Sequence, residues 1–325
     1  MQGILIYGAG AVGLGLASCI LKSGVPVDIL GREETIQALQ HKGLVRTGLF
    51  GAITIPPSGL NGYTQLSDIR NQPYDFILVS TKSFDSEHAA QDIRNHPDLY
   101  HQNTKIILCQ NGWGNAEIFT KHFLQKNIYN ARIITGFYRP QPHEVEITVH
   151  ADEVHLGSLF TDNIDDLQPL AQAINDGDLP CALNSRIDKD LWAKLLYNCS
   201  LNPLGAIFNV PYGQLKDHTP YITLMDQIIE EIFNVMHACG YQTHWETPSE
   251  YRNIFYNTLI PATASHYAST LQDLQARKRT EIDALNGSIC RLSQSHNVPA
   301  PTNHIVYQMV KFLEQKNQHT KKRMT

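Results

Sequence analysis

Residues 3–24 read GILIYGAGAVGLGLASCILKSG, and this stretch decides the fold of the first half of the chain. Residues 4–7 form a short apolar run that is typical of a buried strand, and residues 14–21 continue as an apolar helix. A GxGxxG loop lies between them: Gly8, Ala9, Gly10, Ala11, Val12 and Gly13. The three glycines of such a loop permit a tight turn, close approach of the backbone to a pyrophosphate, and close helix–strand packing. The helix amino terminus offers free N–H groups to the phosphates. The order strand, loop, helix therefore predicts a dinucleotide-binding site.

The end of the next strand indicates which dinucleotide is preferred. The predicted second strand, 27–30, is followed by Gly31 and Arg32, where NAD-binding proteins usually place an acidic residue for the ribose 2′-hydroxyl. A carboxylate would repel a 2′-phosphate, whereas a guanidinium binds it with a planar fork of donors. Arg32 therefore favours NADPH/NADP+ over NADH. Glu33 and Glu34 follow directly and argue in the other direction, and the alternative for Arg32 is an exposed loop residue.

Further strands bring two polar residues to the same edge of the predicted sheet. Lys82 follows the predicted buried strand 74–80, and Asn111 follows the predicted strand 105–109. Ligands bind beyond the carboxyl ends of the strands in an open parallel sheet. We therefore expect Lys82 at the cofactor phosphate or ribose, and Asn111 near the nicotinamide or the substrate. The alternative is that either residue is a solvated loop residue.

Length and periodicity predict two domains. The chain has 325 residues, and a domain usually takes about 150. Alternating stretches within 131–159 predict antiparallel strands that extend the sheet, and PLAQAINDGDLP predicts a helix that closes the domain. Helical patterns then dominate, so we place a dinucleotide-binding domain at 1–186 and a helical domain at 187–325. The helices expected in the second domain are 191–201, 221–239, 250–259, 269–277, 281–295 and 303–316.

A polar stripe on the helix 191–201 and its continuation indicates a binding site. Lys194, Asn198 and Asn202 are spaced four residues apart in an otherwise apolar run. Four residues advance a helix by about 400°, so the three side chains lie along one face. Such a stripe either points at water or lines a site for a small polar molecule.

Composition excludes several classes of partner. The net charge is −5, so the chain has no basic surface that would suggest nucleic acid or an anionic membrane as a partner. No apolar run reaches the roughly 20 residues that span a bilayer. Six scattered cysteines without a CxxC pair are typical of reduced thiols in a cytoplasmic protein. The 15 histidines show no short-range ligand spacing, so no metal site is expected.

Several motifs together resemble the ketopantoate reductase (2-dehydropantoate 2-reductase) family over nearly the whole chain. The segments that carry the resemblance are GAGAVG at 8–13, TKSFD with Lys82, QNGWGN with Asn111, LWAKLLYNCSLNPLGAI with Lys194, STLQD with Ser269, and TEIDALNG with Glu281. The resemblance implies a Rossmann-type α/β domain followed by an all-α domain, with the active site in the cleft between them. It also implies reduction of ketopantoate to pantoate with NADPH, on the route to pantothenate and coenzyme A.

The resemblance also implies a role for each polar residue. Lys194 is the catalytic general acid, and Glu281 holds the lysine and helps to keep it charged. The side chains that line the substrate site are Asn111, Asn198, Asn202 and Ser269. A protonated lysine suits this role because it can stabilise negative charge on the ketone oxygen and then donate a proton to it. No metal is needed, and a homodimer is compatible with the long helical second half.

The chain departs from the usual family pattern in three places. Residues 136–146 read GFYRPQPHEVE where the family tends to show small residues and threonines, and the surroundings of Ser269 and of the NP segment read His266-Tyr267-Ala268 and Pro211-Tyr212-Gly213. A reductase of a different 2-oxoacid on the same scaffold would fit these changes. A β-hydroxyacid dehydrogenase is disfavoured because NSRIDKDLWAK lacks the glycine-rich motif before the lysine. A non-catalytic NADP(H)-binding sensor remains the alternative outside enzymes.

Overall fold

The computed structural model describes residues 3–70 and 73–324, and of residues 318–324 only the backbone. The chain folds into two compact units. The first runs to Gln110 and resumes from Asn115 to Ile187, and the second contains Asn111–Gly114 and everything from Asp188 onward. The segment Asn111–Gly114 therefore belongs to the second unit although it lies within the sequence of the first. The expected boundary at 186/187 takes no account of this insertion.

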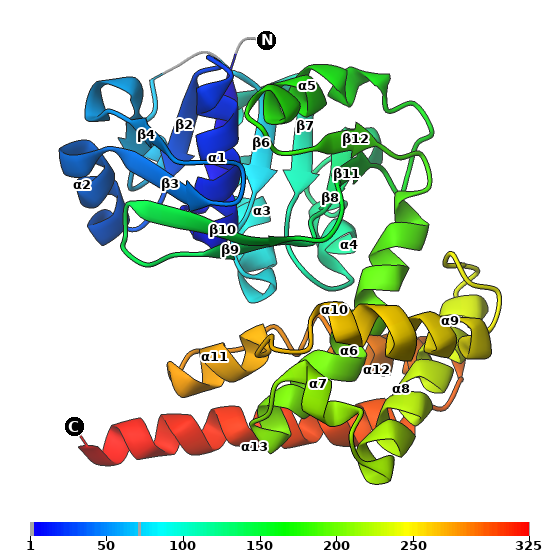
Figure 1. Cartoon of the computed structure of the whole chain (residues 1–325). Helices are drawn as coiled ribbons and strands as arrows, with labels where there is room; N and C mark the ends of the chain where they lie inside the picture. Colours follow the sequence, from blue (N-terminus) through cyan, green and yellow to red (C-terminus); the bar gives the residue numbers. More distant parts are fainter. Residues whose placement is uncertain (1–2, 71–72, 325) are drawn as a thin grey trace. The chain divides into compact units, whose positions relative to one another are not determined.

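The first unit is built on an eight-stranded sheet (Figure 1). Its strand order is β12-β11-β8-β7-β6-β1-β2-β5. The strands β5, β2, β1, β6, β7 and β8 pair in parallel, and β11 joins β8 in the antiparallel sense. Their bounds are β1 Ile4–Tyr7, β2 Val27–Leu30, β5 Asn61–Tyr63, β6 Tyr74–Val79, β7 Tyr100–Leu108, β8 Ile128–Arg132, β11 Val154–Gly157 and β12 Cys181–Leu183. The runs that the sequence predicted as buried strands form the centre of this parallel sheet.

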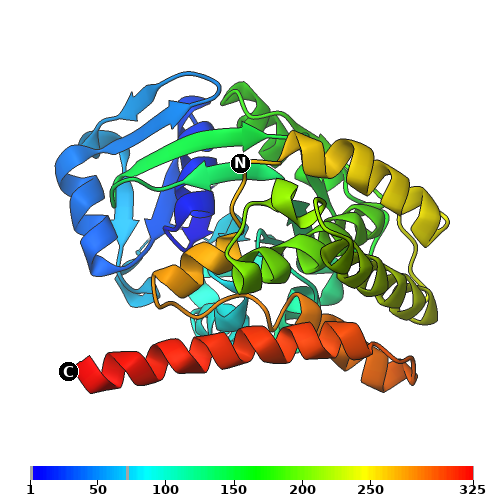
Figure 2. The same ribbon diagram turned by 60° about the horizontal axis from the view of Figure 1, so that its bottom comes forward.

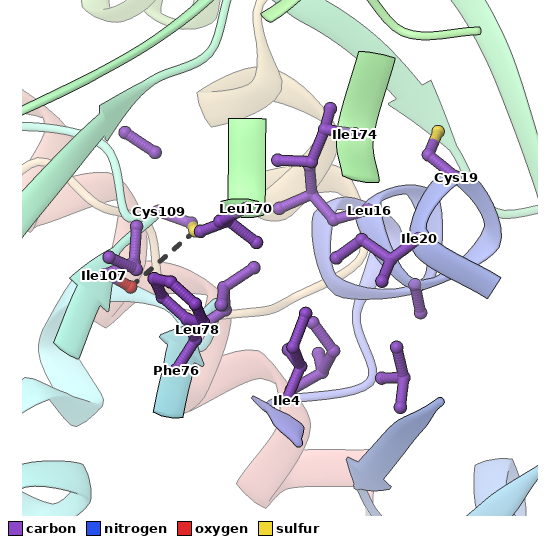
Figure 3. Packing of buried hydrophobic residues seen from close by; sticks show 14 of the residues in the cluster. Ile4, Leu16, Cys19, Ile20, Phe76, Leu78, Ile107, Cys109, Leu170 and Ile174 are labelled. Atoms are coloured by element: carbon purple, nitrogen blue, oxygen red, sulfur yellow. Dashed lines mark hydrogen bonds between the residues drawn. The ribbon is translucent and has the colours of Figure 1, made fainter. Parts of the chain in front are cut away.

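Helices cover both faces of the sheet (Figure 1). Apolar side chains of α1 and α5 pack on one face, and those of α3 and α4 pack on the other. In Figure 3, Leu16 and Ile20 of α1 and Leu170 of α5 lie over Ile4 and Phe76 of the strands. The helices are α1 Ala11–Lys22, α2 Glu33–Lys42, α3 Ser86–Arg94, α4 Asn115–Phe119 and α5 Gln168–Asp176.

A second, four-stranded sheet corrects one prediction. The alternating stretches within 131–159 were expected to extend the main sheet, and β11 does so, but β9 and β10 do not. These two strands form a separate sheet of order β4-β3-β10-β9, in which β10 pairs in parallel with β3 and antiparallel with β9. The bounds are β3 Leu44–Gly48, β4 Ile53–Ile55, β9 Thr135–Tyr138 and β10 Glu144–His150. Local alternation indicates a strand but does not choose its partner.

The second unit is helical. Its longest helices are α6, α8 and α13, the last of which is drawn in red in Figure 2. The bounds are α6 Ile187–Phe208, α7 Tyr212–Leu215, α8 Thr219–Ala238, α9 Pro248–Ile254, a π-helical turn Phe255–Leu259, α10 Ile260–Ala262, α11 Ser269–Gln275, α12 Asn286–His296 and α13 Pro301–Met324. The helix predicted at 281–295 begins only at Asn286, so Glu281 lies in the turn before it.

Candidate functional site

The glycine loop has the shape of a cradle for a pyrophosphate. A Cβ on Gly13 would lie 2.0 Å from the carbonyl oxygen of Gly8 and 2.5 Å from Ser80 Oγ, so this position is closed by packing. A Cβ on Gly10 would meet nothing nearer than the Ser80 carbonyl oxygen at 4.0 Å. The helix α1 begins after Gly10 without a side-chain cap. The loop is thus tight where the helix packs on the strand and open at Gly10, which fits a dinucleotide phosphate at a helix amino terminus.

The two predicted cofactor contacts of the first unit lie at the carboxyl ends of the neighbouring strands. Arg32 is the N-cap residue of α2, directly after β2, and is exposed. Lys82 is half-buried after β6, where it precedes a single 3₁₀ turn. Ser80 Oγ donates to the carbonyl oxygen of Gly8 at 2.6 Å and ties the end of β6 to the glycine loop. The structure therefore brings the loop and the end of β6 together at one edge of the sheet.

Sequence reasoning missed an arginine at this edge. Arg139 follows β9 and is half-buried. Its Nη1 donates to the carbonyl oxygen of Ala9 at 2.8 Å and to Thr35 Oγ1 at 3.3 Å. Burial lowers the pKa of the guanidinium, the Arg32 charge lowers it further, and the Glu34 charge raises it. The available signal was an arginine within GFYRPQPHEVE, the segment that departs from the family pattern.

The polar stripe of the second unit lies on α6, which continues through a proline. Pro203 has no N–H group, so the carbonyl oxygen of Cys199 loses its partner within the helix. The buried Asn286 supplies a replacement, because its Nδ2 donates to that oxygen at 3.1 Å. The helix therefore stays continuous to Phe208 and carries Lys194, Asn198 and Asn202 in the expected register.

Asn202 has a buried partner that the sequence did not indicate. The Tyr212 hydroxyl donates to Asn202 Oδ1, and both side chains are buried. Burial raises the pKa of the Tyr212 hydroxyl, so it remains a donor at neutral pH. The Tyr212 ring also lies 5.3 Å from the His266 ring, centroid to centroid. Two of the three departures from the family pattern therefore meet beside a predicted substrate residue.

Asn111 and Glu281 lie together within the second unit. Asn111 Nδ2 donates to Glu281 Oε2 at 3.3 Å, and the Trp113 N–H donates to the carbonyl oxygen of Ala284 at 2.8 Å. Gly112 has a φ of +86°, and a Cβ there would lie 2.3 Å from the same carbonyl oxygen. Glycine at this position therefore lets Asn111 and Trp113 reach the turn that carries Glu281.

The helix α13 holds the turn around Glu281. Glu314 is buried and accepts from the backbone N–H and the hydroxyl of Thr280 at 2.7 and 2.6 Å. On the other side, burial opposes ionisation of Asp283, but hydrogen bonds from Arg279 and Tyr307 and the Lys311 charge outweigh this effect and lower its pKa. Glu281 itself is only 7% exposed.

Ser269 is the remaining predicted residue. It is exposed at the first position of α11, and Ala268 rather than Ser269 occupies the N-cap. In the part of the chain that the structure describes, no three or more His, Cys, Asp or Glu side chains cluster as metal ligands would. Nor does that part contain a helix long and apolar enough to cross a membrane.

Comparison with known proteins identifies the family. Residues 4–159 match the model of the family described as ketopantoate reductase PanE/ApbA, and residues 186–314 match that of its C-terminal domain. The chain is 34% identical over 312 residues to a 2-dehydropantoate 2-reductase of Aquifex aeolicus (strain VF5), covering 95% of this chain and 96% of that protein.

Solved structures agree with this fold. A PanE/ApbA family ketopantoate reductase from Ralstonia eutropha JMP134 is similar with a TM-score of 0.83 and 26% identity, covering 98% of this chain and 100% of that chain. A D-mandelate dehydrogenase solved with NADH and anilino(oxo)acetate has a TM-score of 0.85 at 23% identity, covering 97% of this chain and 99% of that chain. With both family models matched in order along its length, the chain belongs to the ketopantoate reductase family.

Proposed function

We propose that this protein is a 2-dehydropantoate 2-reductase that reduces ketopantoate to pantoate with NADPH, on the route to pantothenate and coenzyme A. The observation that carries the proposal is the match, over 95% of the chain, to a relative with that name. The glycine loop, open at Gly10 and closed at Gly13, supports dinucleotide binding. The residues we expect to hold the cofactor are Gly8 to Gly13, Arg32, Lys82 and Asn111.

The second unit supplies the groups for the proton. When bound, the reduced nicotinamide provides the hydride for the ketone carbon of the substrate. The Lys194 ammonium stabilises the negative charge that develops on the ketone oxygen and donates a proton to it. Glu281 positions the lysine, and Asn111 is held beside Glu281 at 3.3 Å.

The remaining polar residues orient the substrate. Asn198 and Asn202 share the stripe of Lys194, and with Ser269 they would bind the carboxylate and the distal hydroxyl of ketopantoate. The amide of Asn202 is oriented by Tyr212, which donates to its oxygen and leaves its NH₂ group as the part available to a substrate oxygen.

A second candidate is a reductase of another 2-oxoacid. The departures at Tyr212 and His266 favour it, because their rings meet beside Asn202. Initial rates with ketopantoate, 2-oxoisovalerate and oxaloacetate, each with NADPH and with NADH, separate the two. Preferential turnover of ketopantoate with NADPH supports the first proposal. Preferential turnover of another oxoacid would support the second candidate, with a different substrate and the same reduction mechanism.

Replacement of Lys194 tests whether the protein is an enzyme or a cofactor-binding sensor. Lys194→Ala is expected to lower kcat by roughly 10²–10⁴-fold, the usual contribution of a general acid, while NADPH binding measured by fluorescence stays unchanged. Lys189→Ala is the matched control, because Lys189 lies on the same helix five residues away and off the stripe. Wild-type protein that binds NADPH but turns over no 2-oxoacid would instead support the sensor.

A further inference from the structure

Two arginines from distant parts of the sequence lie in the first unit near the end of β2, where α2 begins. Arg32 occupies the N-cap position of α2, and Arg139, from the segment after β9, bonds Thr35 in that helix and lies near enough for the Arg32 charge to act on it. Arg139 bridges the two elements that a dinucleotide would meet there, since it bonds Ala9 of the glycine loop and Thr35 in the first turn of α2. In dinucleotide-binding folds this side of the loop holds the adenosine ribose.

Packing in the second sheet fixes the position of Arg139. A Cβ on Gly15 of α1 would lie 2.4 Å from the Phe137 ring, so β9 lies directly on the helix that follows the glycine loop. Phe137 pairs with Ile147 of β10, which is fully buried. Arg139 follows directly after β9, and its Nη1 donates to the carbonyl oxygen of Ala9, so its side chain reaches the glycine loop.

The charge at this edge has no internal counter-ion at contact distance. Neither Arg32 nor Arg139 forms an ion pair with any residue that the structure describes, although Glu34 is near enough to act on Arg139 through its charge. Both bonds of Arg139 come from Nη1, and its Nε and Nη2 make no hydrogen bond to the described residues. Two guanidinium groups arranged in this way form a site for a dianion such as a phosphate monoester.

We propose that Arg139 acts with Arg32 to recognise the 2′-phosphate of NADPH and so determines the preference for NADPH over NADH. This inference rests on the proposed binding of a nicotinamide dinucleotide. It adds to Arg32 a residue from the segment in which the chain departs from its family. Arg32 alone, with Glu33 and Glu34 beside it, is a weak anion site, and Arg139 supplies the second positive charge.

The test uses 2′,5′-ADP and 5′-AMP as probes, which differ by the phosphate in question, together with NADPH and NADH. Dissociation constants are measured by calorimetry for wild type, Arg139→Gln, Arg139→Lys and the control Arg94→Gln, whose side chain contacts Tyr100 elsewhere in the unit. Arg139→Gln should raise the dissociation constants of 2′,5′-ADP and NADPH by about 10- to 100-fold, as expected for a lost charge-assisted hydrogen bond. The dissociation constants of 5′-AMP and NADH should stay unchanged. Arg139→Lys keeps the charge without the planar fork, so it should recover only part of the affinity for 2′,5′-ADP, and Arg94→Gln should change nothing.

Other results would overturn the proposal. An equal loss of affinity for all four ligands in Arg139→Gln would show that Arg139 only supports the glycine loop. Wild-type protein that binds NADH as tightly as NADPH would show that the 2′-phosphate is not recognised, with dinucleotide binding intact. Wild-type protein that binds neither dinucleotide would instead contradict the proposed function itself.

Discussion

At the scale of single residues, the second unit orients its polar groups through partners that are themselves buried. Tyr212 donates to Asn202, and Asn286 completes the hydrogen bonding of α6 at Cys199. A buried amide with a fixed donor presents only one of its two ends to a ligand. The direction of the Asn202 amide is therefore decided by Tyr212 and not by α6 alone.

Removal of the Tyr212 hydroxyl tests this arrangement. Tyr212→Phe leaves Asn202 Oδ1 without its donor, and an unsatisfied buried acceptor costs about 1–3 kcal/mol. We expect a lower urea midpoint and a raised KM for the 2-oxoacid, with a smaller change in kcat. Tyr256→Phe is the control, because Tyr256 donates to Asp226 at 2.7 Å away from the stripe. A loss of stability without a change in KM would show that Tyr212 has only a structural role.

At the scale of elements, different glycines of the strand–loop–helix motif serve packing and cofactor binding. Gly13 serves the contact between α1 and the end of β6, whereas Gly10 leaves open space at the start of the helix. The two glycines of one motif therefore have different physical reasons to lack a side chain.

Alanine at each glycine distinguishes these reasons. Gly13→Ala places a Cβ 2.0 Å from a backbone oxygen, so we expect a stability loss of about 1–3 kcal/mol together with weaker NADPH binding. Gly10→Ala has room and a φ of −81°, so it should keep the stability and lose NADPH affinity. Urea unfolding and fluorescence titration measure the two effects. If Gly10→Ala bound NADPH as wild type does, the pyrophosphate would not approach the loop at this residue.

At the scale of the whole molecule, the chain enters the second unit twice. The short segment Asn111–Gly114 leaves the sheet after β7, binds the turn that carries Glu281, and returns to begin α4. A substrate residue predicted from its place after a strand is thus held by the helical unit.

Substitution within this segment should separate cofactor binding from turnover. Gly112→Ala would bring a Cβ to 2.3 Å from the Ala284 carbonyl oxygen and displace Asn111 from Glu281. We expect kcat/KM to fall by more than the NADPH affinity, because Asn111 is only one of the proposed cofactor contacts and the others lie in the first unit. Gly114→Ala is the matched control: its φ is also positive, at +103°, but its nearest neighbour is the flexible end of Arg291 at 3.5 Å. Equal losses in the two variants would attribute the effect to backbone strain alone.

The sequence by itself determined the parts of this protein that depend on local geometry. The glycine loop follows from steric demand, and the strands β1, β2 and β6 follow from short buried runs of sequence. The register of Lys194, Asn198 and Asn202 follows from the helical period of 3.6 residues. These features need no knowledge of distant residues. The motifs that resemble the ketopantoate reductase family can be recognised for the same reason, because each is a short continuous stretch of sequence.

Only the tertiary structure decided which distant segments meet. The pairing of β10 with β3, the position of Arg139 over the glycine loop, and the attachment of Asn111 to Glu281 each join residues about a hundred or more positions apart. Alternation of apolar and polar residues does not specify which strand is the partner. A turn such as that at Glu281 has no repeating hydrophobic pattern from which its structure could be predicted. These contacts depend on packing across the whole unit, and packing is not encoded in any short stretch of sequence.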